Sequence, residues 1–367
     1  VRADRLRAAS GTGVGVGGAA SRAGALPPAT APLEALDAAG LTRADVLERF
    51  VQPGLPVVLR GAGVAPRWSP ADLVARLGSR QVPLRRCAGD SVAWARLEFA
   101  GSAPFDEFAR EHVAQGAADG PGADSGAPQL FDFSVWQQCA DVMAEEVVMP
   151  KWFAVDLYSH ASAHVHPVTG SAAPTLFLAA KGTHSALHVD FLQTHFWMAM
   201  CHGRKRWRLV PREDLPLLYP RYLTDLNPSF PTELDALAER AEAEERPALG
   251  RVRVFEAVLE PGDLIFVPRG WPHKVENLET AVALSANFID RSNVQASLHE
   301  AQALGLVSED PGHVAACLSR AVESGFLDDL EAAAAAGDHV PLRDFKARHG
   351  EPRAPQETQR RVALAAK

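Results

Sequence analysis

Short hydrophobic runs separated by turn-forming residues recur from residue 175 to residue 289. The runs are four to nine residues long and rich in β-branched and aromatic residues, which is typical of strands. We expect strands at Thr175–Ala179, Ala186–Asp190, Phe196–Cys201, Trp207–Val210, Val252–Leu259, Asp263–Val267 and Ala281–Ile289. Short strands joined by turns favour an antiparallel sandwich or barrel. The predicted fold class is therefore mainly β with flanking helices.

Helical patterns flank this β region on both sides. Before it, Thr42 and Ser69 each precede an apolar stripe with helical spacing and are predicted to be N-cap residues. After it, apolar residues within 294–304 and 314–322 recur at helical spacing. We expect the C-terminal helices to bury these stripes against the barrel or against a second copy of the chain in a homodimer.

These patterns divide the chain into five segments. The expected segments are a disordered or targeting segment (1–31), an N-terminal helix and strand region that packs on the core (32–129), a β core with an excursion at 212–250 (130–290), C-terminal helices (291–344) and a polar tail (345–367). The first segment is rich in Gly, Ala and Ser, a composition that buries no core.

Composition and charge narrow the functional class. The chain of 367 residues is 47% hydrophobic and 22% charged, as in ordinary globular proteins. Its 37 Lys and Arg against 45 Asp and Glu give a net charge of −8, which provides no electrostatic footprint for bulk nucleic acid or an anionic membrane. No apolar run approaches the roughly 18 residues that a membrane span needs.

The cysteines and the N-terminal segment bear on the compartment. Four cysteines lie far apart, which argues against a disulfide scaffold or a zinc module and favours reduced thiols in an intracellular protein of the cytoplasm or nucleus. Residues 1–31 are Arg-rich and contain one acidic residue, so organelle targeting is an alternative.

A first chemical signal is the motif His188-Val189-Asp190 within a predicted strand. Because side chains alternate across a strand, His188 and Asp190 point to the same face and can share one metal ion. The motif alone is a weak signal, because two surface polar residues give the same pattern by chance.

A second signal is the stretch 261–273, in which a Pro-Gly-Asp turn, a short apolar strand and a Pro-Arg-Gly turn lead to His273. Two histidines and one carboxylate form the ligand set of non-haem Fe(II) oxygenases. Three protein ligands leave coordination positions for a chelating co-substrate and for O₂.

A third signal is the basic turn Gly203–Trp207. A lysine ammonium inside a barrel needs an anion, and the far carboxylate of 2-oxoglutarate would pair Lys205. Alternatively, Lys205 is solvated and Arg204 or Arg206 points inward. Three further polar residues are expected to line the same pocket, namely Ser185, Ser285 and Asn287.

Together these motifs resemble the JmjC domain, a cupin-type double-stranded β-helix or jelly roll. The resemblance covers roughly residues 44–290 and is closer to the small JmjC-only hydroxylases than to multidomain histone demethylases. It is carried by Leu55–Gly61, Leu130–Asp132, Pro150–Phe153, Thr183–Asp190, Gly203–Trp207, Pro261–His273 and Ala286–Phe288. It implies a jelly-roll core at 130–290, His188, Asp190 and His273 as iron ligands, and Lys205 as the partner of the 2-oxoglutarate carboxylate.

The sequence departs from that family at the expected co-substrate pocket. Relatives usually carry an asparagine on the strand before the lysine, where this chain has Met198 at an inward position, with Thr194 as the nearest polar residue. A tyrosine two residues before the Phe-Asp pair is replaced by Gln129. The metal ligands are intact, so the departures concern 2-oxoglutarate and not iron.

The resemblance therefore implies an Fe(II)- and 2-oxoglutarate-dependent dioxygenase that converts 2-oxoglutarate and O₂ to succinate and CO₂ while hydroxylating a substrate. A protein side chain is the expected substrate, with RNA as the less favoured class. Two alternatives remain: an N-methyl-lysine demethylase with the same chemistry, and a non-catalytic cupin-like scaffold that binds peptides. Against the scaffold stands the complete set of three ligands.

Overall fold

The computed structural model describes residues 30–350 apart from 90, 114–125, 165–172, 223–225, 232–233, 235–244 and 336. The strands are β1 Thr30–Pro32, β2 Ala35–Asp37, β3 Val57–Arg60, β4 Gln81–Cys87, β5 Leu97–Pro104, β6 Gln129–Ser134, β7 Val148–Met149, β8 Thr175–Ala179, β9 His184–His188, β10 His195–His202, β11 Lys205–Leu209, β12 Val254–Leu259, β13 Leu264–Val267, β14 His273–Asn277, β15 Ala281–Phe288 and β16 Val340–Pro341. The α-helices are α1 Arg43–Val46, α2 Pro70–Leu77, α3 Phe105–Phe108, α4 Val135–Met143, α5 Leu157–His164, α7 Val294–Gly305, α8 Glu309–Glu323, α9 Phe326–Ala334 and α10 Leu342–Arg348.

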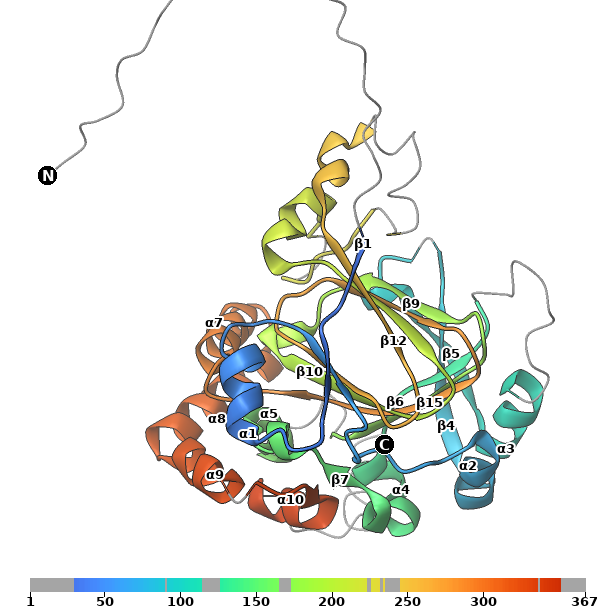
Figure 1. Ribbon diagram of the computed structural model, residues 1–367, viewed down its shortest axis with the longest axis horizontal. Coiled ribbons are helices and arrows are strands. Elements are labelled where there is room, and N and C mark those ends of the chain that lie inside the picture. Colours follow the sequence, from blue (N-terminus) through green and yellow to red (C-terminus); the bar gives the residue numbers. More distant parts are fainter. Residues whose placement is uncertain are drawn as a thin grey trace, which may run out of the picture.

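Two sheets face each other and form the predicted jelly-roll core (Figure 1). The smaller sheet has the strand order β1-β12-β11-β14-β9, and the larger one has the order β2-β3-β13-β10-β15-β8-β6-β4-β5. Strands β8 to β15 supply four neighbouring strands to each sheet, and each pairs antiparallel with its neighbours among the eight. Strand β1 extends the smaller sheet beside β12, strands β2 and β3 and strands β6, β4 and β5 extend the larger sheet on its two sides, and β7 pairs with β16 in a separate small sheet.

Strand β10 shows how the chain separates two hydrophobic cores. Phe196, Met198 and Met200 point between the sheets, where they pack with Trp207 and Ile265. The alternating residues of β10 point to the opposite face, against the helices. This confirms the inward positions expected from strand periodicity, and it places Met198 inside the barrel.

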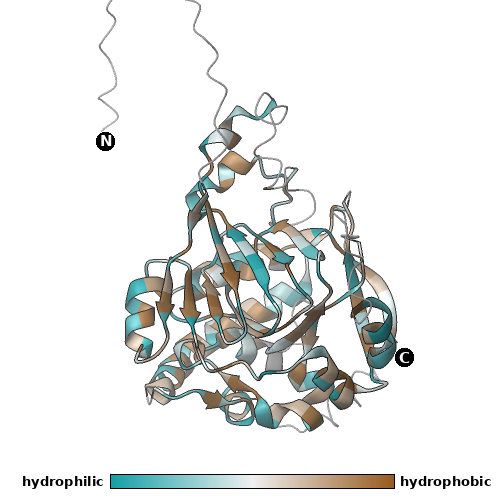
Figure 2. Ribbon diagram, turned by 45° about the vertical axis from the view of Figure 1, so that its right-hand side comes forward, coloured by the Kyte–Doolittle hydropathy of each residue, from teal (hydrophilic) through white to brown (hydrophobic). Residues whose placement is uncertain are grey.

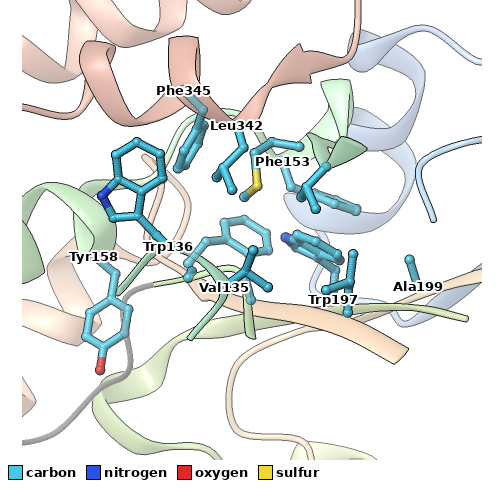
Figure 3. Packing of buried hydrophobic residues seen from close by; sticks show 14 of the residues in the cluster. Val135, Trp136, Phe153, Tyr158, Trp197, Ala199, Leu342 and Phe345 are labelled. Carbon is cyan, nitrogen blue, oxygen red and sulfur yellow. The ribbon is translucent and has the colours of Figure 1, made fainter. Parts of the chain in front are cut away.

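The second core lies between the larger sheet and the helices. Figure 3 shows Trp197 of β10 in one cluster with Val135 and Trp136 of α4, with Phe345 of α10, and with Phe153 of the short turn Lys151–Phe153. Figure 2 shows that many of the hydrophobic residues lie in the strands, whereas hydrophilic and hydrophobic residues alternate along the outer helices. The helices therefore shield the outer face of a sheet whose inner face lines the barrel.

The two predicted N-caps form as expected. The Thr42 and Ser69 side chains each accept a hydrogen bond from the backbone N–H three residues on. The Asp45 and Asp72 carboxylates accept one in turn from the backbone N–H of the cap residue. These reciprocal capping boxes fix the starts of α1 and α2.

The C-terminal helices bury their apolar stripes against their own chain, as a cover on the larger sheet. Val294 and Ala301 of α7 and Leu318 of α8 belong to the same core as the outward residues of β10. This favours packing of the helices on the barrel of their own chain, and a dimer through these helices stays a prediction. Among the described residues, no helix is both long and apolar enough to cross a membrane.

Two segment boundaries differ from the sequence-based expectation. Thr30 and Ala31, assigned to the N-terminal segment, instead pair with β12 as part of β1, and residues 1–29 lie outside the described residues. The polar tail expected from residue 345 begins later, because Phe345 is fully buried in α10. The seven-residue helix α10 buries its aromatic residue through long-range packing, which local composition does not reveal. Residues 351–367 are not described.

Candidate metal centre

His188 and His273 face each other across two neighbouring strands. His188 ends β9, His273 begins β14, and the two residues are direct partners in the antiparallel register. Asp190 follows two residues after His188, and one ligand atom from each of the three residues lies within 4.8 Å of the others. All three side chains are buried. The structure thus brings together the three residues that the sequence predicts as metal ligands.

The histidine rings present their Nε2 atoms to this common point. Nδ1 of His188 lies 2.6 Å from the carbonyl oxygen of Ala186, and Nδ1 of His273 lies 2.9 Å from that of Trp271. A carbonyl oxygen only accepts, so each Nδ1 carries the proton and each Nε2 keeps its lone pair. Such a backbone partner is the usual way in which proteins orient a metal-binding imidazole.

Burial shifts the pKa of His188 and of Asp190. It holds the pKa of His188 well below its usual range, and the nearby His273 lowers the same pKa further. Burial also raises the pKa of Asp190, against the opposing effects of His273 and of a hydrogen bond from Asn287. Two imidazole nitrogens and one carboxylate around a buried point fit a divalent transition metal, whose charge favours the ionised carboxylate.

Thr194 and Asn287, predicted to contact the co-substrate, lie beside Asp190. Asn287 forms a hydrogen bond with the Asp190 carboxylate, and its Nδ2 donates to Oγ1 of Thr194 at 2.9 Å. Thr194 in turn donates to the carbonyl oxygen of Phe191 at 2.9 Å. The pair orients the carboxylate in this structure, and its contact with a co-substrate stays a prediction.

Lys205 is buried at the start of β11. Its Nζ donates to Oδ1 of Asn277 at 2.6 Å, and Nδ2 of Asn277 donates to Oγ1 of Thr183 at 2.8 Å. Burial lowers the pKa of Lys205 to about 7. Arg204 and Arg206 instead lie near surface carboxylates, Glu260 and Glu279 for the first and Glu276 for the second. Among the three basic residues of the turn, Lys205 is therefore the one inside the barrel.

A cavity of about 640 Å³ joins the histidine and carboxylate cluster to Lys205. Ser185, Met198 and Gln129 also line it. Gln129, at the position where relatives have a tyrosine, donates from Nε2 to the carbonyl oxygen of His184 at 3.2 Å. Ser285 is not among the lining residues; its Oγ lies 3.1 Å from Oγ1 of Thr175, and Thr175 reaches the cavity in its place.

Sequence reasoning missed two residues that contact this centre. Asn277 is the partner of Lys205, and only the register of β11 against β14, which places the two opposite each other, could have revealed it. Trp94, from the loop between β4 and β5, donates from Nε1 to the carbonyl oxygen of Val189 at 2.8 Å and packs edge-on against the His188 ring at 4.5 Å. No local motif predicts a contact between residues so far apart along the chain.

Other histidines and cysteines lie away from this centre. His160 is part of α5, where its Nδ1 lies 3.2 Å from the carbonyl oxygen of His349, and His166 lies outside the described residues. Cys139 and Cys201 are buried, and burial raises the pKa of Cys139 to about 12, as expected for core thiols.

Comparison with known proteins gives one family and several relatives. The sequence model of the cupin-like domain matches residues 43–293. An arginine-specific demethylase JMJ20 from Arabidopsis thaliana is 29% identical over 119 residues, which cover 32% of this chain and 24% of that protein. HSPB1-associated protein 1 from Mus musculus is 28% identical over 205 residues, 50% of this chain and 41% of that protein.

A third relative matches over a longer stretch. The 2-oxoglutarate and iron-dependent oxygenase JMJD4 from Mus musculus is 22% identical over 273 residues, which cover 70% of this chain and 60% of that protein. The chain thus spans between 24% and 60% of the length of these three curated relatives.

We expect each of His188→Ala, Asp190→Ala and His273→Ala to lower the affinity for a divalent metal by more than about 100-fold, beyond the loss caused by removing an outer-shell partner. Calorimetric titration of the metal-free protein with Mn(II) measures this. The exposed His299 provides the control, since His299→Ala should bind like wild type. Wild-type affinity in any one of the three variants would remove that residue from the ligand set.

Proposed function

This chain belongs to the cupin-like domain family, and we propose that it is an Fe(II)- and 2-oxoglutarate-dependent dioxygenase that hydroxylates a protein side chain. The observation that carries the proposal is one cavity lined both by two histidines and an aspartate that meet at one point and by the buried Lys205. The name of the JMJD4 relatives as iron- and 2-oxoglutarate-dependent oxygenases supports it.

In this proposal His188, Asp190 and His273 hold the iron, with three protein ligands leaving further coordination positions open. Iron with 2-oxoglutarate and O₂ supplies oxidative decarboxylation to succinate and CO₂ together with insertion of oxygen into a substrate C–H bond. The backbone carbonyls of Ala186 and Trp271 keep the protons on Nδ1 and so hold both rings in the binding orientation.

Lys205 pairs the far carboxylate of 2-oxoglutarate. Its ammonium is anchored from behind by Asn277, so it is already directed and loses little freedom when the anion arrives. The cavity of about 640 Å³ is large enough for the co-substrate and the end of a substrate side chain. Aromatic residues that line it, among them Trp94, Phe131 and Phe191, exclude water from the reacting atoms.

A protein substrate fits the chain better than RNA, because a net charge of −8 does not attract a polyanion. HSPB1-associated protein 1 among the relatives is named for association with a protein. We also place this enzyme inside the cell, where its four cysteines, all buried, stay reduced.

Turnover of 2-oxoglutarate tests the function directly. The purified protein with Fe(II) should convert 2-oxoglutarate to succinate slowly on its own and faster with its substrate, while Asp190→Ala should give background only. Peptides from a proteome treated with the enzyme should gain 16 Da. Release of formaldehyde would instead favour the demethylase alternative. If wild type produced no more succinate than Asp190→Ala, the non-catalytic scaffold would be the remaining interpretation.

We expect Lys205→Ala to weaken 2-oxoglutarate binding by about 30- to 3,000-fold, because truncation of one partner of a buried charge pair costs roughly 2–5 kcal/mol. Lys205→Arg should recover only part of the loss, since a planar guanidinium replaces a compact charge. Titration of the Mn(II)-loaded protein measures this, with the exposed Lys181→Ala as control. Superimposable curves for wild type and Lys205→Ala would exclude the pairing.

The lowered pKa of Lys205 makes 2-oxoglutarate binding depend on pH. In the free protein Lys205 is cationic below its pKa of about 7 and increasingly neutral above it. Because the dicarboxylate binds the cation, the affinity should fall by up to about tenfold per pH unit above pH 7, and binding at pH 8 should take up close to one proton. Calorimetry of the Mn(II)-loaded protein in two buffers of different ionisation enthalpy counts the proton. Lys205→Arg should abolish the uptake; equal uptake by that variant would assign the proton to another group.

A further inference from the structure

The turn directly after Asp190 adopts a backbone conformation that its residues disfavour. Leu192 and Gln193 have φ values of 54° and 50°, in the left-handed region that residues other than glycine rarely enter. Two consecutive residues of this kind persist only where the surroundings hold them. The turn leads from the Asp190 carboxylate into β10, so its shape affects where that carboxylate points.

Helix α7 holds this turn through Glu300. One carboxylate oxygen of Glu300 accepts a hydrogen bond from the backbone N–H of Leu192 at 2.7 Å, and the other accepts one from Nε2 of Gln193 at 2.7 Å. Asn293, just before α7, donates from Nδ2 to the carbonyl oxygen of Gln193 at 2.9 Å. The backbone and the side chain of the left-handed turn are thus both tied to the same helix.

Gln193 connects this turn to the segment that precedes His273. Its Oε1 accepts from the Arg269 guanidinium at 3.2 Å, while its Nε2 donates to Glu300. The Arg269 backbone N–H is fixed in turn by Nδ1 of His195, at 3.1 Å. One amide therefore bridges the segments next to two of the three predicted ligands.

We propose that Glu300 and Gln193 are positioning residues of the metal centre, through which helix α7 sets the geometry of Asp190 and His273. The proposal rests on the proposed iron site. Glu300 lies beyond residues 43–293, the part of the chain that matches the cupin-like domain, so the site extends into the C-terminal helices. The amide of Gln193 must direct its oxygen to Arg269 and its NH₂ to Glu300. Because this orientation is fixed, exchanging the amide and the carboxylate between positions 193 and 300 tests the pair.

Reciprocal substitution tests the proposal. In Gln193→Glu two carboxylates face each other, and in Glu300→Gln two NH₂ groups meet, or a flipped Gln193 turns its NH₂ toward Arg269. The double variant Gln193→Glu/Glu300→Gln restores every bond: the amide at position 300 accepts from Leu192 and donates to the carboxylate at position 193, which accepts from Arg269.

The readout is the affinity of the metal-free protein for Mn(II), measured by calorimetry, together with the unfolding temperature without metal. Each single variant should bind Mn(II) about tenfold more weakly than wild type, the lower end of the loss expected for an outer-shell partner. The double variant should return to within about threefold of wild type. Glu309→Gln, an equal change of charge at an exposed position of α8, should bind like wild type.

The possible outcomes separate this proposal from the function on which it rests. A wild-type chain that binds no Mn(II) overturns the metal centre and the positioning role together. If wild type binds Mn(II) and both single variants bind it equally tightly, this overturns only the positioning role. So does a double variant as weak as the weaker single one, or a loss of unfolding temperature with unchanged Mn(II) affinity, since a merely structural contact would produce either result.

Discussion

The antiparallel pairing of β9 with β14 is the constraint on which the site depends. It places His188 directly opposite His273, and the strand alternation then brings Asp190 to the same face. Each imidazole donates to a carbonyl oxygen two residues earlier in its own segment, so the backbone that sets the ring positions also sets their tautomers. A slip of the register by one residue would move His188 to the opposite face and separate the ligands.

Strand β9 is the last strand of its sheet, so the ligand-bearing edge needs partners from outside the jelly roll. The N-terminal region supplies them as side chains: Gln129 donates to the carbonyl oxygen of His184, Trp94 donates to that of Val189, and Cys87 Sγ lies 3.4 Å from Nε2 of His184. Residues of the segment 32–129 therefore do more than cover the core. They complete the wall of the cavity and support the backbone between the first two ligands.

Local patterns in the sequence predict much of this arrangement, and register determines the rest. Alternation along 196–201 predicts the inward side chains of β10, and the strand periodicity of the His-x-Asp motif predicts its shared face. Asn277 and Thr175 escaped detection because their places in the cavity depend on sheet register, which sets Asn277 opposite Lys205 and Thr175 opposite Ser285. Trp94 contacts the His188 ring and Glu300 contacts the turn after Asp190, each from a segment about a hundred residues away along the chain, and no periodicity encodes such contacts.

Burial drives Asp190 and Lys205 in the cavity toward their neutral forms, and this links the binding of the metal to the binding of the co-substrate in the proposed enzyme. It raises the pKa of Asp190 and lowers the pKa of Lys205 to about 7, so burial disfavours both of these charges. A divalent cation compensates the Asp190 carboxylate, and a dicarboxylate compensates the Lys205 ammonium. In the proposed enzyme, 2-oxoglutarate would meet both charges, because it carries its chelating end and its far carboxylate on one molecule. The proposed function therefore implies a cavity that favours metal and co-substrate bound together over either alone.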